Sequence, residues 1–405
     1  MRDVAAAVGL AEGEPGVRSV IATLARLEPV SIRGISRAVE LPVPIVASIC
    51  GELRKRAVVA EERPAQLTPA GRGLFAAGAL DLGRSAACPT CAGRAIAIPS
   101  HLIRLTAELR RIAKSAPPPV FELDQCHCTV ETKIRRVLAM QEADALVGRR
   151  VLLLGDDDLT SVAIRGFVER FGSKATIANL TVVDVDPGVV GFVREQLAGA
   201  PFPVTCVQHD LREALEPGLL RSFDTVVTDP PYTLAAARLF LSRSAEALDR
   251  AGGNVFFSFG SRRPEASFHV QQTILQMGFV IRRLVRDFNE YIGAGVLGGT
   301  SHLYHLSPTS AVRARVTGRF DGPLYTADVS SRATTRPGPK SRTGEADLRF
   351  GRTHAGGDAS APPPARRRQS PATINRSAGA SPPRVPPRSG SSQEPCESES
   401  FRTEP

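Results

Sequence analysis

Along residues 133–307, short apolar runs alternate with stretches in which apolar residues recur at helical spacing. Short apolar runs of strand length, such as VLLL at 151–154, precede stretches with apolar residues at helical spacing, such as 161–172. A repeated order of strand then helix predicts a mostly parallel α/β sheet with helical crossovers. The predicted strands cover 149–155, 176–186, 203–210, 223–233 and 252–260. The predicted helices cover 133–146, 161–172, 189–199, 234–249 and 268–279, with a short one at 211–215 after the third strand. The segments 281–291 and 301–308 predict a closing pair of strands.

Residues 17–80 show helical apolar spacing followed by two short strand signals. We predict a separate N-terminal domain that covers residues 1–84. Apolar spacing predicts helices at 17–27, 31–41 and 43–56, with Ser31 as a possible cap. Two short strands around a turn follow within 57–76. This order is typical of a winged helix, a module that binds DNA or docks other domains. Only Arg54, Lys55 and Arg56 cluster on it, beside Glu52, so docking is the favoured interpretation.

Residues 308–405 are predicted to be a disordered tail. They are rich in Pro, Ser, Gly and Arg, and they lack apolar residues at regular spacing. The chain has a net charge of +10, and this segment supplies 16 of its 51 Lys and Arg against 9 of its 41 Asp and Glu. The basic excess therefore belongs mostly to the tail, where Arg366–Arg368 could touch nucleic acid. The core is close to neutral, which argues against binding nucleic acid there.

Residues 85–130 read as a connector that holds four of the seven cysteines. Cys88 and Cys91 form a C-x-x-C pair, and Cys126 and Cys128 form a C-x-C pair. Two thiolate pairs could bind a structural zinc ion, but C-x-C is a poor second half for such a site. Free thiols are the favoured interpretation, and zinc is the alternative.

The chain as a whole indicates an intracellular protein. No apolar run approaches the roughly 18 residues that a membrane helix needs. The first residues lack the basic and apolar regions of a secretory signal, and an odd number of cysteines fits reduced thiols. We therefore expect a cytoplasmic location and no membrane partner.

Acidic residues stand at the end of four predicted strands. Ligands of such sheets bind beyond the carboxyl ends of the strands, so these residues are the candidate site. The carboxylate after the second strand commonly takes ribose hydroxyls, which favours Asp184, with Asp186 as the alternative. Asp210, after the third strand, is placed to face an adenine amino group; helix capping is the alternative for such acids. The four groups are Gly155-Asp156-Asp157-Asp158, Asp184 with Asp186, His209-Asp210, and Asp229-Pro230-Pro231-Tyr232.

The first of these loops predicts a positively charged ligand. A dinucleotide loop would read G-x-G-x-x-G, whereas here one glycine precedes three acids that would repel a phosphate. A sulfonium nucleoside or a polyamine would suit such a loop. Acids also favour the first turn of a helix, but capping accounts for one or two acids and hardly for three.

The sequence DPPY indicates an amine nucleophile. Its prolines fix the backbone and offer no amide donors, the Asp229 carboxylate or a carbonyl can accept an amine proton, and Tyr232 offers a ring face to a cation. An amine and a sulfonium donor imply in-line transfer of a methyl or an aminopropyl group. Acids beside the donor's tail favour decarboxylated S-adenosylmethionine, which carries an ammonium and no carboxylate.

Taken together, GDDDLTS, VVDVD, HDLRE, TDPPYT, LFLSR, SFGSR and FNEY…GGTSHLYHL resemble the branched-chain polyamine synthases over roughly residues 15–308. The resemblance implies a Rossmann-like, methyltransferase-type domain at 131–307. It also implies transfer of aminopropyl groups from decarboxylated S-adenosylmethionine to the secondary amine of spermidine, with methylthioadenosine released. Members of the family resemble one another in forming homodimers. By position, the resemblance puts the catalytic acid at Asp158.

The predicted roles can then be assigned. Asp158 and Asp229 orient the attacking nitrogen and take its proton, while Asp157, Pro230 and Tyr232 complete the substrate pocket. Asp184 or Asp186 holds the ribose and Asp210 the adenine, and Gly155, Asp156 and Asp157 form the donor loop. Two alternatives stay open: an amino-methyltransferase of DNA or RNA, and a winged-helix regulator that senses a ligand.

Overall fold

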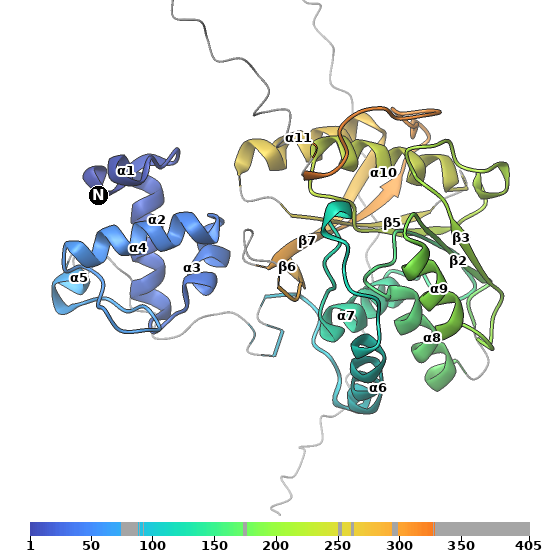
Figure 1. Cartoon of the computed structure of the whole chain (residues 1–405), viewed down its shortest axis with the longest axis horizontal. Helices are drawn as coiled ribbons and strands as arrows, with labels where there is room; N and C mark the ends of the chain where they lie inside the picture. The colour runs from blue at the N-terminus through green and yellow to red at the C-terminus, as the bar shows by residue number, and fades with distance from the viewer. Residues whose placement is uncertain are drawn as a thin grey trace, which may run out of the picture. The chain divides into compact units, whose positions relative to one another are not determined.

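The computed structural model describes residues 1–73, 88, 90–91, 93–172, 176–249, 253–260, 263–293, 299–326 and 328 (Figure 1). The predicted tail beyond residue 328, including Arg366–Arg368, lies outside these residues.

The N-terminal part is helical, as its apolar spacing predicts. Helix α1 (Arg2–Val8), which the sequence analysis did not foresee, precedes α2 (Gly13–Leu27), α3 (Ile32–Val39), α4 (Val43–Lys55) and α5 (Pro69–Gly73). The Ser31 hydroxyl caps α3 by accepting the Gly34 amide at 3.0 Å. Where two strands were predicted, the chain forms single antiparallel bridges, Val30 with Ala65 and Val59 with Leu67. The winged-helix assignment stays a prediction.

The α/β domain is built on a seven-stranded sheet with the order β3-β2-β1-β4-β5-β7-β6. Strands β1 to β5 pair in parallel, and β7 pairs antiparallel with both β5 and β6, as predicted for the closing pair. The strands are β1 (Arg150–Leu154), β2 (Asn179–Asp184), β3 (Val204–Gln208), β4 (Thr225–Thr228), β5 (Asn254–Phe259), β6 (Phe279–Glu290) and β7 (Thr300–Pro308).

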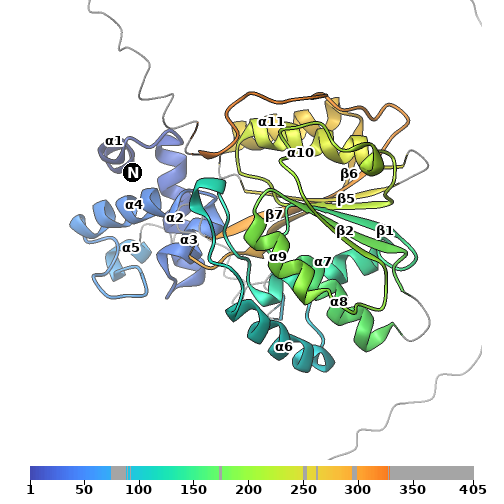
Figure 2. The same cartoon turned by 45° about the vertical axis from the view of Figure 1, so that its right-hand side comes forward.

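Helices cover both faces of this sheet (Figures 1 and 2). Helices α6 (Ile103–Lys114), α7 (Val130–Glu142), α8 (Thr160–Phe171) and α9 (Pro187–Gln196) lie on one side. Helices α10 (Leu234–Ala247) and α11 (Pro264–Gln276) lie on the other. Alternate residues of β1 serve the two layers: Val151 and Leu153 pack into the first core, and Leu152 and Leu154 into the second. Both faces of a parallel strand are thereby buried, which explains its unbroken apolar run.

Two segments differ from the predictions. The predicted connector contains α6, flanked by short 3-10 helices at Ser100–Leu102 and Phe121–Leu123. Leu105 and Leu109 of α6 are buried in the first core, so the amphipathic spacing of residues 103–114 was a helix signal within the predicted connector. No helix forms at 211–215, and a 3-10 turn, Pro217–Leu219, follows instead.

The boundary of the ordered domain was placed too early at residue 308. Residues 309–326 pack against the second core, where Leu324 is buried and Val312, Val316 and Phe320 are partly buried. The guanidinium of Arg243, which is fully buried, donates to the Gly318 carbonyl at 2.5 Å and so fixes this segment to α10. The prediction was wrong here because a few apolar side chains suffice when α10 and α11 offer them a packing surface; the Ser242 hydroxyl and the Gln276 carbonyl also bond this segment.

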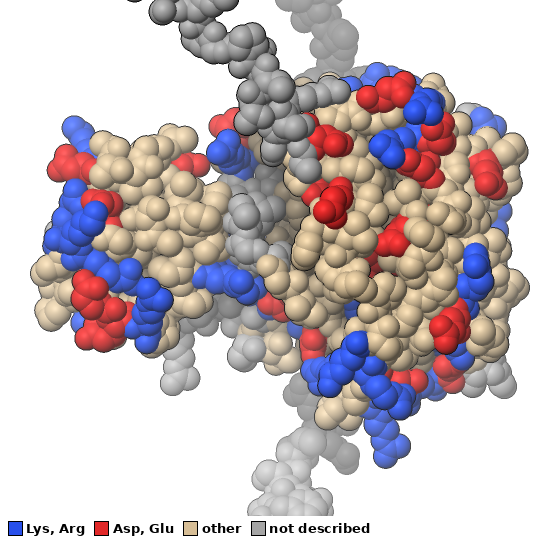
Figure 3. Space-filling model, viewed as in Figure 1, with Lys and Arg blue, Asp and Glu red and all other residues tan. Residues whose placement is uncertain are grey.

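Among the described residues, no single helix has both the length and the apolar composition to cross a membrane; the bent pair α3 and α4 meets that test only when the two are joined. Exposed basic residues gather on α6, at the lower end of the domain in Figure 3. They are Arg104, Arg110, Arg111 and Lys114.

Candidate active site

A cavity lies at the carboxyl ends of the parallel strands. It encloses about 510 Å³ of empty space, counting its mouth. Four carboxylates and no Lys or Arg are among its lining residues. These residues are Leu123, Gln125, Gly155, Asp157, Asp184, Val185, His209, Asp210, Leu211, Asp229, Pro231, Phe240, Leu324 and Tyr325. Strand ends that are far apart in the sequence thus meet as predicted.

Asp156, the first acid of the loop, is tied into the protein. It is 1% exposed, and it accepts hydrogen bonds from the amides of Thr160 and Ser161 and from the Ser161 hydroxyl at the start of α8. Burial raises its pKa to about 7, against the opposing effect of these bonds. The preceding Gly155 has φ of +79°, a left-handed conformation that suits glycine at this sharp exit from β1. Asp156 is therefore the acid that helix capping explains.

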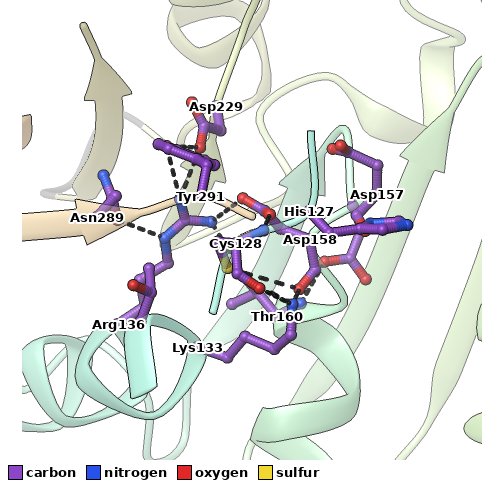
Figure 4. A network of polar contacts seen from close by, with 12 residues as sticks. His127, Cys128, Lys133, Arg136, Asp157, Asp158, Thr160, Asp229, Asn289 and Tyr291 are labelled. Atoms are coloured by element: carbon purple, nitrogen blue, oxygen red, sulfur yellow. Dashed lines mark hydrogen bonds and ion pairs between the residues drawn. The ribbon is translucent and has the colours of Figure 1, made fainter. Parts of the chain in front are cut away.

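Asp157, the second acid, faces the cavity. Its side chain accepts one hydrogen bond, from the Cys126 amide at 3.2 Å, and in Figure 4 no contact joins its carboxyl group to the guanidinium of Arg136. Burial raises the pKa of Asp157 well above its usual value, and the charges of Asp158, Asp184 and Asp229 raise it further. A carboxylate with a raised pKa is a stronger base toward an ammonium group than an ordinary one.

Asp158, the third acid, is 3% exposed and lies behind the cavity lining. One oxygen accepts the Cys128 amide at 2.5 Å, and the other pairs with Nη1 of Arg136 at 2.7 Å. Burial alone would raise its pKa, but Arg136, Lys133 and the Cys128 amide outweigh burial and lower it to about 2. Asp158 is thus held ionised by the protein itself. This geometry favours Asp157 over Asp158 as the acid that meets substrate.

Asp229 joins the cavity to a pair of tyrosines. One oxygen accepts the Tyr232 hydroxyl at 3.1 Å, and the other accepts the Tyr291 hydroxyl at 2.5 Å and pairs with Nη2 of Arg136 at 2.6 Å. Burial raises the pKa of Asp229 to about 6, although Arg136 opposes the rise. The Tyr232 ring lies against Phe259 with centroids 5.3 Å apart. Pro231, rather than the buried Pro230, lines the cavity.

The acids of the second and third strands have distinct surroundings. Asp184 ends β2 and accepts the amides of Asp156 at 2.8 Å and Asp186 at 2.9 Å, one on each oxygen. Asp186 caps α9 through the Gly188 amide and also accepts Nε2 of Gln125 at 2.9 Å. Asp184 lines the cavity and Asp186 does not.

Asp210 pairs with Arg212 through both oxygens, the shorter contact being 2.6 Å. Burial raises its pKa, but Arg212 outweighs burial and lowers it. Asp210 is thus an anchored acid at the rim of the cavity rather than a helix cap.

The sequence analysis left zinc binding by the cysteine pairs as the alternative to free thiols. Across the described residues, no three His, Cys, Asp or Glu side chains gather as metal ligands. The segment QCHC instead lies along the acidic loop: the Cys126 and Cys128 amides bind Asp157 and Asp158, and the His127 ring bonds the Asp157 carbonyl at 2.9 Å. Its contribution is to position the acids through backbone donors.

Several site residues escaped the sequence analysis. Arg136, Tyr291, Gln125 and Tyr325 lie in or beside the cavity, and the sequence alone assigned a role to none of them, although Tyr291 ends the FNEY segment of the family resemblance. Tyr291 follows β6 and Tyr325 lies in the supposed tail, so only the folded chain brings them to the strand ends. For Arg136 a signal existed, because a charged residue at a buried position of a predicted helix needs a partner.

Comparisons with known proteins identify the family of this chain. Residues 104–312 match the model of the branched-chain polyamine synthase A C-terminal domain. The chain belongs to the branched-chain polyamine synthase family. It is therefore an enzyme of the aminopropyltransferase class, as the resemblance predicted.

Two relatives show the extent of the match. An uncharacterized protein of Methanocaldococcus jannaschii is 33% identical over 311 residues, which are 76% of this chain and 77% of that protein. The N(4)-bis(aminopropyl)spermidine synthase of Thermococcus kodakarensis is 31% identical over 270 residues, 64% of this chain and 74% of that protein.

A solved structure shows the same fold. It is the branched-chain polyamine synthase of Thermus thermophilus in complex with N4-aminopropylspermidine and 5'-methylthioadenosine. The TM-score is 0.61 at 24% identity, covering 80% of this chain and 96% of that one.

Proposed function

We propose that this polyamine synthase transfers an aminopropyl group from decarboxylated S-adenosylmethionine to the secondary amine of spermidine, and that methylthioadenosine leaves. The observation that carries the proposal is the cavity lining, which offers four carboxylates and no Lys or Arg. Both proposed substrates are cations without phosphate, so such a lining attracts each of them. Relatives named N(4)-bis(aminopropyl)spermidine synthase support the choice of acceptor.

The donor would lie along β1, β2 and β3. Asp184 uses one lone pair on each oxygen for backbone amides, which leaves others for the ribose hydroxyls. Asp210, fixed by Arg212, would face the adenine, and Tyr325 and Leu324 would close that end. Asp186 is less suited to the ribose because the Gly188 amide and Gln125 already occupy its oxygens.

The acceptor would lie between Asp157 and Asp229. The secondary amine attacks the carbon next to sulfur, a nitrogen–carbon bond forms, and the carbon–sulfur bond breaks with its electron pair left on sulfur. The proton leaves the nitrogen for Asp157, whose raised pKa fits it for this transfer. Asp229 would hold an ammonium group of the acceptor, and the Tyr232 hydroxyl positions the Asp229 carboxylate by donating a hydrogen bond to it. Alignment of the two substrates would supply much of the rate.

The test is to incubate the full chain with spermidine and decarboxylated S-adenosylmethionine and to identify the products by mass spectrometry. We expect methylthioadenosine together with spermidine carrying one or two additional aminopropyl units. Tandem fragmentation should place them on the secondary nitrogen. Release of S-adenosylhomocysteine from S-adenosylmethionine, with no aminopropyl product, would instead support a methyltransferase and refute the proposal.

We also propose that the enzyme works as a cytoplasmic homodimer, in line with the family resemblance. Light scattering of the purified chain should then give twice its mass of 43.1 kDa. A monomer at working concentration would contradict this.

A further inference from the structure

The guanidinium of Arg136 on α7 contacts the acids of the site on the side away from the cavity. It is 3% exposed and lies between Asn289, Asp158 and the Asp229–Tyr291 pair (Figure 4). Its Nη1 pairs with Asp158 at 2.7 Å and its Nη2 with Asp229 at 2.6 Å, while Nε donates to the Asn289 amide oxygen at 2.9 Å. The fork geometry of Arg suits this bridging of two carboxylates, which a Lys could not reproduce.

A purely structural role explains this arrangement poorly. Burying a guanidinium and two carboxylates is costly, and apolar replacements of such clusters are often neutral or stabilising. Here the cluster also lies against a cavity rather than in a closed core, because Asp229 is one of the lining residues. A group kept at this cost beside a site is a candidate for a role in it.

We infer that Arg136 is a positioning residue, which keeps Asp158 and Asp229 ionised and oriented and thereby leaves Asp157 as the acid that receives the substrate proton. This inference rests on the proposed function for its catalytic consequence. The guanidinium touches neither proposed substrate, since it is absent from the cavity lining. It acts through the two carboxylates that it holds.

The effect of removing Arg136 on the pKa of Asp229 follows from the groups around that carboxylate. The groups that face it are Arg136 of α7, the loop acids Asp157 and Asp158, and the hydroxyls of Tyr232 and Tyr291. Arg136 is the one cation in that set. Its removal leaves burial and like charges to raise the pKa of Asp229 further, so Asp229 takes up a proton near neutral pH. Protonated Asp229 no longer attracts an ammonium group.

Asp158 is affected less, because it keeps the Cys128 amide and the nearby ammonium of Lys133, which donates to the Asp158 carbonyl at 2.6 Å. The pH dependence of an Arg136 variant should therefore report mainly on Asp229.

The experiment compares Arg136→Met and Arg136→Lys with Arg135→Met. Arg135 is the adjacent residue on α7, also buried, and its Nε and Nη1 contact no partner among the described residues, so its replacement leaves the acids unchanged. Release of methylthioadenosine is measured from pH 6 to 9, with kcat and KM resolved. Urea unfolding is followed over the same range.

At pH 7 we expect kcat of Arg136→Met to fall about 10²-fold, as when one electrostatic partner is removed from a site. Arg136→Lys should lose less, and Arg135→Met should match the wild type. The ratio of Arg136→Met to wild-type activity should rise with pH, by up to about tenfold per unit while Asp229 titrates. A constant ratio over this range would overturn the inference, because a merely structural lesion does not depend on the ionisation of Asp229.

Unfolding gives a readout that does not need activity. An acid whose pKa is raised in the folded state lowers stability as pH rises towards that pKa. In the wild type the pKa of Asp229 is about 6, so the loss of stability that its ionisation causes is complete near pH 6. In Arg136→Met the loss should continue above pH 6, and the gap in urea midpoint between variant and wild type should widen up to pH 8. A gap that stays constant refutes the inference. Absence of aminopropyl transfer by the wild type refutes the proposed function alone.

Discussion

Replacing Asp157 by Asn should mainly lower activity, whereas replacing its neighbour Asp158 by Asn should lower the stability of the fold. Asp157→Asn removes a carboxylate whose side chain accepts one hydrogen bond, from Cys126, and whose pKa is raised by burial. An acid with a raised folded pKa is destabilising at neutral pH, so its replacement should leave the folded state as stable as before or more stable. Turnover should fall about 10²- to 10³-fold, because the proton acceptor is lost.

Asp158→Asn removes a carboxylate that the fold itself stabilises. Its pKa is about 2 against a usual 3.8, and a shift of this size corresponds to about 2.5 kcal/mol of stability at neutral pH. A lowered pKa contributes stability above pH 4 that is lost as pH falls towards 2. The substitution also leaves Arg136 with one carboxylate, and breaking a buried ion pair costs about 3–5 kcal/mol. Both figures describe loss of the same pairing between Asp158 and Arg136, so they are not added, and we expect a loss of about 2–5 kcal/mol.

The assay for both variants is the midpoint of urea unfolding at pH 7, together with kcat from methylthioadenosine release. Asp157→Asn should lower kcat while keeping the midpoint, and Asp158→Asn should lower the midpoint. Full activity in Asp157→Asn would refute its role as proton acceptor. An unchanged midpoint in Asp158→Asn would refute the ion-pair argument.

Three further predictions follow from the same structure. The acid limb of kcat/KM should include a group with pKa near 6, since Asp229 must be ionised to hold an ammonium, and a pH–rate profile flat from pH 5 to 8 would contradict this. Leu324→Ala should cost about 2–4 kcal/mol in urea unfolding, because Leu324 is 3% exposed in the second core, and it should raise KM for the donor; an unchanged midpoint would show that residues 309–326 contribute no packing. Treatment with a zinc chelator should leave kcat unchanged, and loss of activity restored by zinc would revive the cysteine site.

The parallel part of the fold could be predicted because each strand is an apolar run flanked by helical spacing. The carboxyl-end rule predicts that Asp157, Asp184, Asp210 and Asp229 meet at one edge of the sheet, and all four line the cavity. Both inferences use local patterns, and both hold because a parallel sheet orders its strand ends.

The division of labour among the three loop acids could not be predicted. It depends on Arg136, Cys126 and Cys128, which approach the loop from α7 and the segment before it. The sequence spacing alone does not indicate that Asp158 pairs with Arg136 while Asp157 lines the cavity. The catalytic assignment carried to Asp158 by resemblance stays untested, and the geometry is the reason to prefer Asp157.

The most direct test of an acid-lined cavity that grips two cationic substrates is a crystal structure of the full chain with methylthioadenosine and spermidine. The account predicts the nucleoside against Asp184 and Asp210 and the spermidine nitrogens against Asp157 and Asp229. Phosphate or sulfate bound among these acids, or spermidine bound elsewhere on the protein, would contradict it.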